Sequence, residues 1–143
     1  MSDIQSLSPL ITVGEIESCL DFWTDALGFT VTATVPADPS LMGTDAAEGA
    51  PLGFAMLQSG DVTIMLQTGA SMDGDLPGLS DEVQPSTAML FLKVEALDPY
   101  LPRLEGVEIV HERRTTFYGM DEIFVRGSCG TIVGLAAPVS GEA

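Results

Sequence analysis

The richest run of chemically capable side chains is HERRTTFYGMDEIFVR, residues 111–126. It contains the only histidine of the chain, His111, and among its charged residues Glu122 and Arg126. Alternate residues of a strand point to the same side, so Glu122 and Arg126 share a face if this segment is a strand. There, His111 or Glu122 would exchange protons while Arg126 steadies an anion. The alternatives are an ordinary cleft or surface histidine and an exposed Glu122–Arg126 ion pair, worth less than about 1 kcal/mol.

Aromatic side chains accompany this polar run. Phe124 lies between Glu122 and Arg126 on the same predicted face, and Tyr118 follows Phe117 just before a glycine at the entry of the strand. A ring at that position would close over a ligand. We therefore predict that Tyr118, Glu122, Phe124 and Arg126 contact a ligand together with His111.

No other short motif indicates a particular chemistry. The sequence lacks a nucleophile elbow, a phosphate-binding loop and a dinucleotide fingerprint. Residues 73–75 (Asp-Gly-Asp) lack the rest of a calcium-binding loop. Cys19 and Cys129 have neither metal-binding nor redox spacing, so we expect two free thiols. Free thiols, the missing secretory signal and the absence of an apolar run near ~20 residues favour a cytoplasmic protein outside the membrane.

The strand and helix patterns occur twice in the same order. The length of 143 residues suits a single domain. The first half shows a strand at 8–13, a helix at 14–28, a strand at 29–35, a long loop at 36–51 and a hairpin at 52–58 and 62–67. The second half shows a strand at 87–94, a shorter helix at 95–106 that Pro102 makes irregular, a strand at 107–113 and a hairpin at 121–126 and 131–137. We predict an α+β fold with module one at about 7–68, a linker loop at 69–85 and module two at about 86–138.

Most of the predicted strands have one aliphatic face and one mixed face. The aliphatic faces should lie under the two helices on the outer side of the sheet, and the mixed faces should line the other side. The residues expected on the mixed side, where a ligand would bind, are Ser8, Met65, Gln67, Met89, Phe91 and Gly134. A glycine within a strand leaves a gap between side chains. We therefore expect Gly134 to leave room for a ligand beside the adaptable methionines.

Charge is distributed unevenly along the chain. There are 21 acidic and 5 basic residues, a net charge of −16, and every base lies after residue 92. Nucleic acid is excluded as a partner, because phosphates require a basic patch. An acidic surface attracts a cationic ligand. The alternative explanation of the charge is solubility alone.

Three segments resemble the vicinal oxygen chelate superfamily, which includes glyoxalase I, extradiol dioxygenases and bleomycin-resistance proteins. They are SPLITVGEIESCLDFWTDALGF, DVTIMLQ and YGMDEIFVRGSCGTIVGLA, and the similarity extends over roughly residues 7–138. The resemblance implies that the paired βαβββ modules form a half-open β-barrel with helices on the outer face. It also implies a homodimer whose clefts are shared between chains.

In the metal-dependent members of that superfamily, four strands each supply one ligand, usually His or Glu. The resemblance places these positions at Ser8, Met65, Met89 and Gly134. A hydroxyl, two thioethers and a glycine do not replace imidazole or carboxylate ligands. We therefore expect no metal and no cofactor.

Two functions of different class remain. The first is a metal-free protein that resembles the bleomycin-resistance branch and sequesters a small molecule without catalysis. The second is a lyase, isomerase or dioxygenase of the same superfamily with a non-standard active site.

Overall fold

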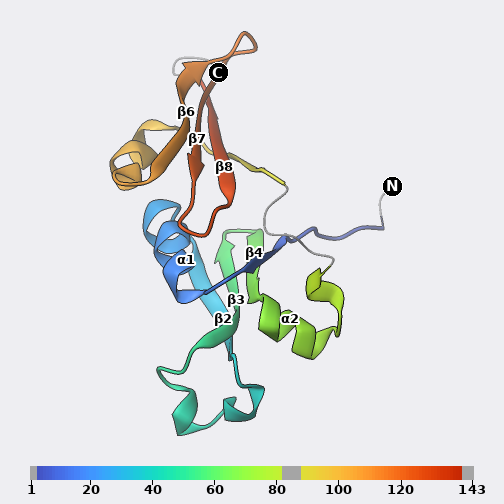
Figure 1. The fold of residues 1–143 in the computed structure, drawn as a ribbon. Helices are drawn as coiled ribbons and strands as arrows, with labels where there is room; N and C mark the ends of the chain where they lie inside the picture. The colour runs from blue at the N-terminus through green and yellow to red at the C-terminus, as the bar shows by residue number, and fades with distance from the viewer. Residues whose placement is uncertain (1–2, 82–87, 140–143) are drawn as a thin grey trace.

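The computed structural model describes residues 3–81 and 88–139, which form two four-stranded sheets and several short helices (Figure 1). Sheet A has the strand order β1-β4-β3-β2, and sheet B has the order β5-β8-β7-β6. The pairs β1–β4 and β5–β8 are parallel, and all other strand pairs are antiparallel. Sheet A contains β1 (Leu10–Val13), β2 (Thr30–Pro36), β3 (Leu52–Ser59) and β4 (Val62–Thr68). Sheet B contains β5 (Leu90–Lys93), β6 (Glu108–Thr115), β7 (Met120–Arg126) and β8 (Ile132–Pro138). The predicted α+β class and the repeated strand order are confirmed.

The first predicted helix forms, but its second half is wider than an α-helix. α1 (Glu17–Asp21) continues directly into the π-helical segment η1 (Phe22–Ala26). The Leu27 N–H donates to the Phe22 carbonyl at 3.2 Å, and the Phe29 N–H donates to the Trp23 carbonyl at 2.9 Å. This wider turn lets the adjacent Phe22 and Trp23 both enter the core, where they are 6% and 2% exposed.

The second predicted helix is the 3-10 segment η5 (Asp98–Leu104). It has Pro99 in its first turn and Pro102 within it, which agrees with the irregularity that we expected from Pro102.

The segment after β4 differs from the expected linker loop. Its first part forms α2 (Gly69–Asp75), and Leu79–Asp81 forms the 3-10 segment η4. The Thr68 side chain accepts a hydrogen bond from the Ser71 N–H at 3.2 Å and caps the helix, while Met72 is almost fully buried. Residues 82–85 of the expected loop lie outside the described residues. The long connection between β2 and β3 carries η2 (Pro39–Leu41) and η3 (Asp45–Ala47).

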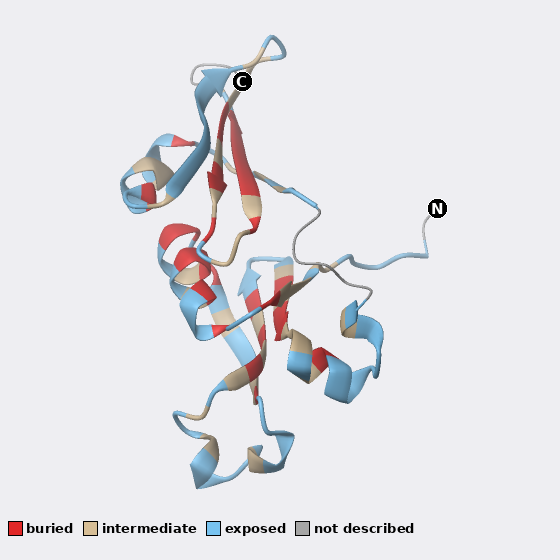
Figure 2. Ribbon diagram, in the orientation of Figure 1, coloured by how far each residue is buried: buried red, intermediate tan, exposed pale blue. Residues whose placement is uncertain are grey.

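The outer faces of both sheets contact one shared core. Buried side chains of α1, η1, sheet A and sheet B belong to the same apolar cluster, and Figure 2 shows this burial along the helix and the central strands. Sheet A contributes Ala55, Leu57, Ile64 and Leu66; sheet B contributes Ile123, Val125, Val133, Leu135 and Ala137. Since both outer faces meet at this core, both inner faces point away from it. Within residues 3–81 and 88–139, no helix combines the length and apolar character needed to cross a membrane.

The expectation of two free thiols is wrong. Cys19 on α1 and Cys129 in the β7–β8 turn form a disulfide, with Cα atoms 5.5 Å apart and a sequence separation of 110. The surrounding contact is close, because the Ser128 hydroxyl donates to the Ser18 carbonyl at 2.6 Å. A Cβ at Gly127 would lie 2.7 Å from the ring of Phe22, so only glycine fits this turn. The disulfide therefore fastens the helix of the first half to sheet B.

An ion triad fastens η5 to sheet B. Arg113 Nη2 lies 2.6 Å from Asp121 Oδ2 and 2.9 Å from Asp98 Oδ1. The hydrogen bonds from Arg113 hold the pKa of Asp121 below its usual value, and the hydrogen bonds to Asp121 and Asp98 raise the pKa of Arg113.

Replacing both cysteines, Cys19→Ser with Cys129→Ser, should lower the free energy of unfolding by about 2–4 kcal/mol, because the cross-link restricts the unfolded chain. Guanidinium unfolding with and without dithiothreitol measures this loss. The reductant should destabilise the parent protein by the same amount and leave the double variant unchanged. Equal stability of the parent protein under both conditions would contradict the prediction.

Replacing Asp121 with Asn should flatten the dependence of stability on pH in acid. The folded pKa of Asp121 is lowered, so this carboxylate stabilises the fold above its unfolded pKa, about 3.9, and the contribution is lost as the pH falls further. Melting temperatures between pH 6 and pH 3 should fall more steeply for the parent than for Asp121→Asn. Asp61→Asn, in the β3–β4 turn, is the control and should keep the steep parent slope.

Candidate functional site

The inner face of sheet B brings together most of the predicted ligand contacts. The strand register places two rows of side chains side by side across this face, from β5 to β6. The first row is Phe91, Gly134, Phe124 and His111, and the second is Lys93, Ala136, Glu122 and Arg114. Met89 precedes β5 and is 52% exposed. The first row is therefore aromatic, and the second is charged.

Gly134 does not leave an empty gap, contrary to our expectation. A Cβ at this position would lie 2.6 Å from Phe124 Cε2 and 3.2 Å from Phe91 Cδ1. The missing side chain makes room for the ring of Phe124, which lies across β8. The space that we had assigned to a ligand is thus filled by the protein itself.

The rings around Phe124 form what we call the aromatic platform: Phe91, His111 and Phe124. The centroid of Phe124 lies 6.4 Å from that of Phe91 and 6.2 Å from that of His111. The guanidinium carbon of Arg114 lies 5.7 Å from the Phe124 centroid, within the range of a cation–π contact. Phe91 is 54% exposed, so the platform offers an aromatic surface to solvent. Such a patch is characteristic of binding sites.

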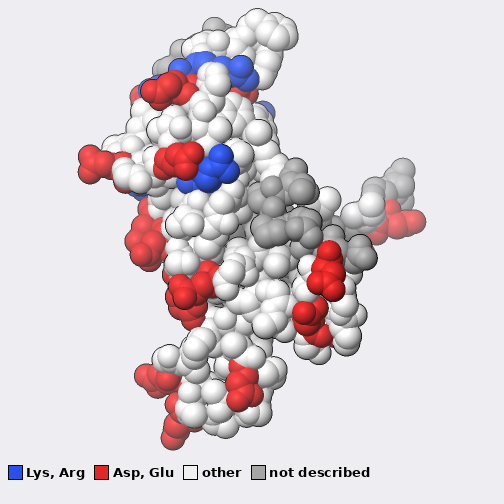
Figure 3. All heavy atoms as spheres, viewed as in Figure 1, with Lys and Arg blue, Asp and Glu red and all other residues white. Residues whose placement is uncertain are grey.

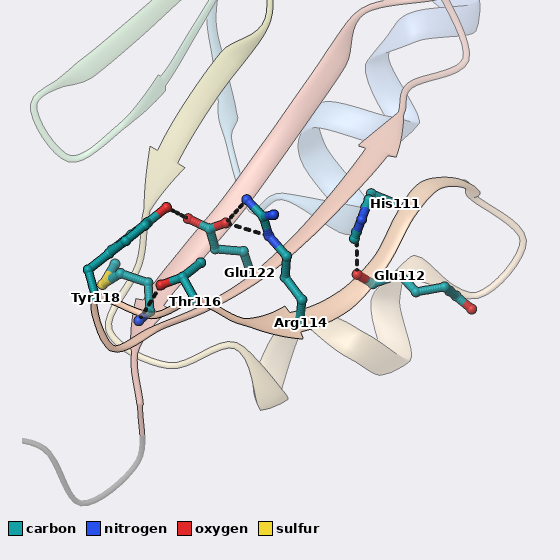
Figure 4. A network of polar contacts seen from close by, with 7 residues as sticks. His111, Glu112, Arg114, Thr116, Tyr118 and Glu122 are labelled. Carbon is teal, nitrogen blue, oxygen red and sulfur yellow. Dashed lines mark hydrogen bonds and ion pairs between the residues drawn. The ribbon is translucent and has the colours of Figure 1, made fainter.

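A buried carboxylate lies beside the platform. Glu122 is 1% exposed, and its Oε1 accepts hydrogen bonds from Arg114 Nη2 at 2.9 Å and Nε at 3.1 Å. The Tyr118 hydroxyl lies 3.1 Å from Oε2 and donates to it (Figure 4). The alternative of an exposed Glu122–Arg126 ion pair is wrong, since Arg126 Nε instead contacts Glu108 Oε2 at 3.3 Å. Both oxygens of Glu122 are therefore satisfied within the chain.

The other side chains of the predicted polar run lie outside this network. His111 Nδ1 contacts the Glu112 carbonyl at 2.8 Å (Figure 4). Phe117 is 99% exposed and packs edge-on against Tyr118, with centroids 4.9 Å apart. Arg126 lies one row beyond the platform, opposite Ile132.

The remaining predicted site residues lie on or near sheet A. Met65 is half-buried and pairs with Leu10 and Met56, and Ser8 precedes β1. Gln67 is 7% exposed, and its Nε2 donates to Ser71 Oγ at 3.1 Å. This group belongs to sheet A and the platform to sheet B, and no strand pairing among the described residues joins the two sheets within one chain.

The four positions that the resemblance linked to metal binding do not fit a divalent ion. Met65 lies in sheet A and Ser8 just before its first strand, whereas Gly134 lies in sheet B and Met89 just before β5. Their donors are a hydroxyl and two thioethers, and the place of a side chain at 134 is filled by Phe124. Over residues 3–81 and 88–139, no three His, Cys, Asp or Glu side chains converge as metal ligands would.

Arg114 is the site residue that the sequence did not reveal. β6 has register shifts between Ile109 and His111 and again between His111 and Arg114. Each shift breaks the simple alternation of faces. The one available signal was the Arg113-Arg114 pair, because adjacent residues of a strand face opposite sides.

The comparisons with known proteins agree with this architecture. The family model of the Glyoxalase/Bleomycin resistance protein/Dioxygenase superfamily matches residues 5–135, and the chain belongs to this superfamily. None of the curated protein sequences compared matches the chain.

Solved structures share the fold at low sequence identity. A glyoxalase/bleomycin resistance protein/dioxygenase from Nocardioides superposes with a TM-score of 0.68 and 19% identity, covering 99% of this chain and 88% of that one. TioX from Micromonospora sp. ML1 superposes with a TM-score of 0.71 and 15% identity, covering 95% of this chain and all of that one (100%). At these identities the likeness concerns the fold alone.

Replacing Arg114 with Met should destabilise the protein by about 1–3 kcal/mol at neutral pH, because it removes two donors from the buried carboxylate of Glu122. Denaturant unfolding measures the loss. Arg126→Met is the matched control, because its partner Glu108 is exposed and such a pair contributes less than about 1 kcal/mol. Equal losses in the two variants would contradict a special role for the Glu122 network.

Proposed function

We propose that this protein binds a planar aromatic small molecule on the aromatic platform and sequesters it without chemical change. The observation that supports this is the exposed ring of Phe91 next to the partly buried ring of Phe124, beside the Glu122 carboxylate, whose oxygens are hydrogen-bonded to Arg114 and Tyr118. A flat ligand would stack on the rings, since offset aromatic pairs are favourable. Antibiotic resistance by sequestration, as in the bleomycin-resistance branch, is the role that this proposal implies.

The local charge favours a neutral or acidic ligand on the platform. Lys93 and Arg114 lie in the row beside it. In Figure 3 the basic side chains in view lie in the upper part of the molecule, over sheet B, with acidic side chains among them, whereas the charged side chains in view on the lower part are all acidic. The cationic ligand considered for the whole chain therefore suits other surfaces better than this one.

We propose further that two chains pair so that the inner face of sheet A in one chain faces the platform of its partner. This arrangement is supported by the separation of the candidate residues, with Met65 and Gln67 on one face and Phe91 and Phe124 on another. A homodimer would unite both groups around one ligand, as the resemblance implies.

A second candidate function is acid–base catalysis at the same face. It is favoured by the Tyr118–Glu122–Arg114 network, because buried polar groups at a ligand-facing surface are typical of active sites. Metal analysis of protein purified without chelator, together with assays for lyase and isomerase turnover, distinguishes the two functions. Stoichiometric metal or turnover that Glu122→Gln abolishes would favour catalysis.

The cytoplasmic location that we expected also stays a proposal. Disulfides persist mainly in oxidising compartments. Alkylation of the protein at the moment of cell lysis preserves the oxidation state of Cys19 and Cys129. If the two cysteines are found as thiols, the protein is in a reducing compartment such as the cytoplasm; if they are found as the disulfide, an oxidising compartment is favoured.

Replacing Phe124 with Leu should weaken binding of 2-naphthoate, used as a probe, about five- to tenfold, because the variant keeps apolar volume and loses ring stacking. Amide chemical-shift titrations measure the affinity and should map the probe to β5, β7 and β8. Phe117→Leu is the control, because this exposed ring lies outside the platform. The absence of shifts on sheet B at millimolar probe would overturn the proposed site.

A further inference from the structure

We propose a second ligand site, at the junction where the helix of the first half meets the end of sheet B. Its ligand is a small zwitterion with an ammonium group at one end and a carboxylate at the other. We call this site the junction pocket, and its charged lining residues are Asp21, Asp25, Arg103, Glu108 and Arg126. It shares no lining residue with the aromatic platform, so it does not depend on the function proposed for that surface.

The junction pocket is a cavity of about 610 Å³ between three segments of the chain. α1 and η1 form its first wall, the connection from η5 into β6 forms the second, and the end of β7 with the β7–β8 turn forms the third. Figure 1 shows α1 beside this end of sheet B. Phe22, Ala26 and Val107 supply apolar lining. The volume lies within the range of small-molecule sites, about 300–1,000 Å³.

Two links hold the first and third walls at a fixed separation. The Cys19–Cys129 disulfide joins α1 to the β7–β8 turn, and the Ser128 hydroxyl donates to the Ser18 carbonyl. The walls therefore keep their spacing as long as these contacts persist, and the pocket is a fixed feature of the fold.

The helical wall presents two carboxylates that have no basic partner among the described residues. Asp21 and Asp25 are four positions apart on one continuous helical segment, which places them on the same side of it. Neither forms an ion pair with a described residue. Within the described part of the chain, the one hydrogen bond to either carboxylate is a long one, 3.4 Å from the Thr24 hydroxyl to Asp25 Oδ1. This wall therefore attracts an ammonium group.

The second wall presents a guanidinium group that is held in place without a carboxylate. Arg103 Nε donates to the Pro99 carbonyl at 3.2 Å, and its Cζ lies 4.7 Å from the centroid of the Tyr100 ring. Its Nη1 lies over the backbone of Gly28, where a Cβ would be 3.6 Å away. Arg103 makes no ion pair with any residue that the structure describes. These contacts orient the guanidinium and leave its Nη groups to a carboxylate of the ligand.

Arg126 on the third wall adds a second, weakly engaged guanidinium. Its two contacts are long, 3.3 Å from Nε to Glu108 Oε2 and 3.4 Å from Nη1 to the Gly130 carbonyl. By contrast, Arg113 and Arg114 each make two hydrogen bonds to a carboxylate at 3.1 Å or less. The arginines of the junction pocket thus retain donor capacity that the arginines of sheet B next to Asp121 and Glu122 have used.

Opposite charges therefore line one cavity without pairing. No ion pair joins Arg103 to Asp21 or Asp25, although all three line the pocket. A simple cation would gain from the helical wall and be repelled by Arg103, whereas a simple anion would gain from Arg103 and be repelled by the two aspartates. A zwitterion gains at both walls, and its apolar chain would contact Ala26 and Val107.

The test uses the full chain with three probes built on the same six-carbon chain. 6-Aminohexanoate carries both charges, 6-aminohexanamide carries only the ammonium, and hexanoate carries only the carboxylate. Amide chemical-shift titrations should show saturable binding of 6-aminohexanoate, with shifts at Gly106, Gly127 and Gly130, and about three- to fivefold weaker binding of each other probe. Intermolecular NOEs between the probe methylenes and the Val107 methyl groups should place it in the pocket.

Variants then assign each charge of the ligand to a wall. Arg103→Gln should weaken 6-aminohexanoate about three- to fivefold without weakening 6-aminohexanamide. The double variant Asp21→Asn with Asp25→Asn should weaken both ammonium probes without weakening hexanoate. Melting temperatures verify that each variant is folded.

Two controls exclude general effects. Asp61→Asn removes an acid outside the pocket and should leave the affinity for all three probes unchanged. Phe124→Leu should leave 6-aminohexanoate binding intact, so that failure of the platform and failure of the junction pocket are distinguishable.

Four results would each overturn the proposal. The first is the absence of saturable 6-aminohexanoate binding at millimolar concentrations. The second is equal affinity for the three probes, which would remove the requirement for both charges. The third is equal weakening by Asp61→Asn and by the double aspartate variant, which would show attraction to the acidic surface in general. The fourth is a set of shifts and NOEs confined to residues outside the junction pocket.

Discussion

The packing of both sheets against one helical segment is the constraint on which the rest of the molecule depends. Ile16, which precedes α1, and Phe22 and Trp23 of η1 are buried in a core that both outer faces share. Since this core occupies the outer sides, the inner faces are left to solvent and to ligands. The Cys19–Cys129 bond and the Phe22–Gly127 contact hold sheet B to the same helix. The orientation of each candidate site follows from this one contact.

The sequence was sufficient to predict the positions of the strands and the faces of their side chains, because both follow from the alternation of apolar and polar residues. β3, β4, β7 and β8 appear within a residue or two of their expected places, because apolar and polar side chains alternate along them. The inner-face positions of Phe91, Phe124 and Gly134 follow from the same rule. What alternation cannot show is volume, and so the ring of Phe124 in the space beside Gly134 was not foreseen.

The features that were missed depend on contacts between distant segments. GASMDGD contains two glycines and two aspartates and has low intrinsic helix propensity, yet α2 forms because Thr68 caps it and Met72 is buried. The register shifts in β6 turned Arg114 toward Glu122, which no regular period indicates. Nothing in the spacing of two cysteines 110 positions apart indicates that they meet.

The relation between Gly134 and Phe124 restricts how this chain can change. The two positions share one volume on neighbouring strands, so the effect of a substitution at either depends on the residue at the other. A side chain introduced at 134 would meet the ring of Phe124, so that ring would have to turn aside or become smaller to admit it. The present position of the Phe124 ring and a side chain at 134 therefore exclude one another, and the evolution of either position is tied to the other.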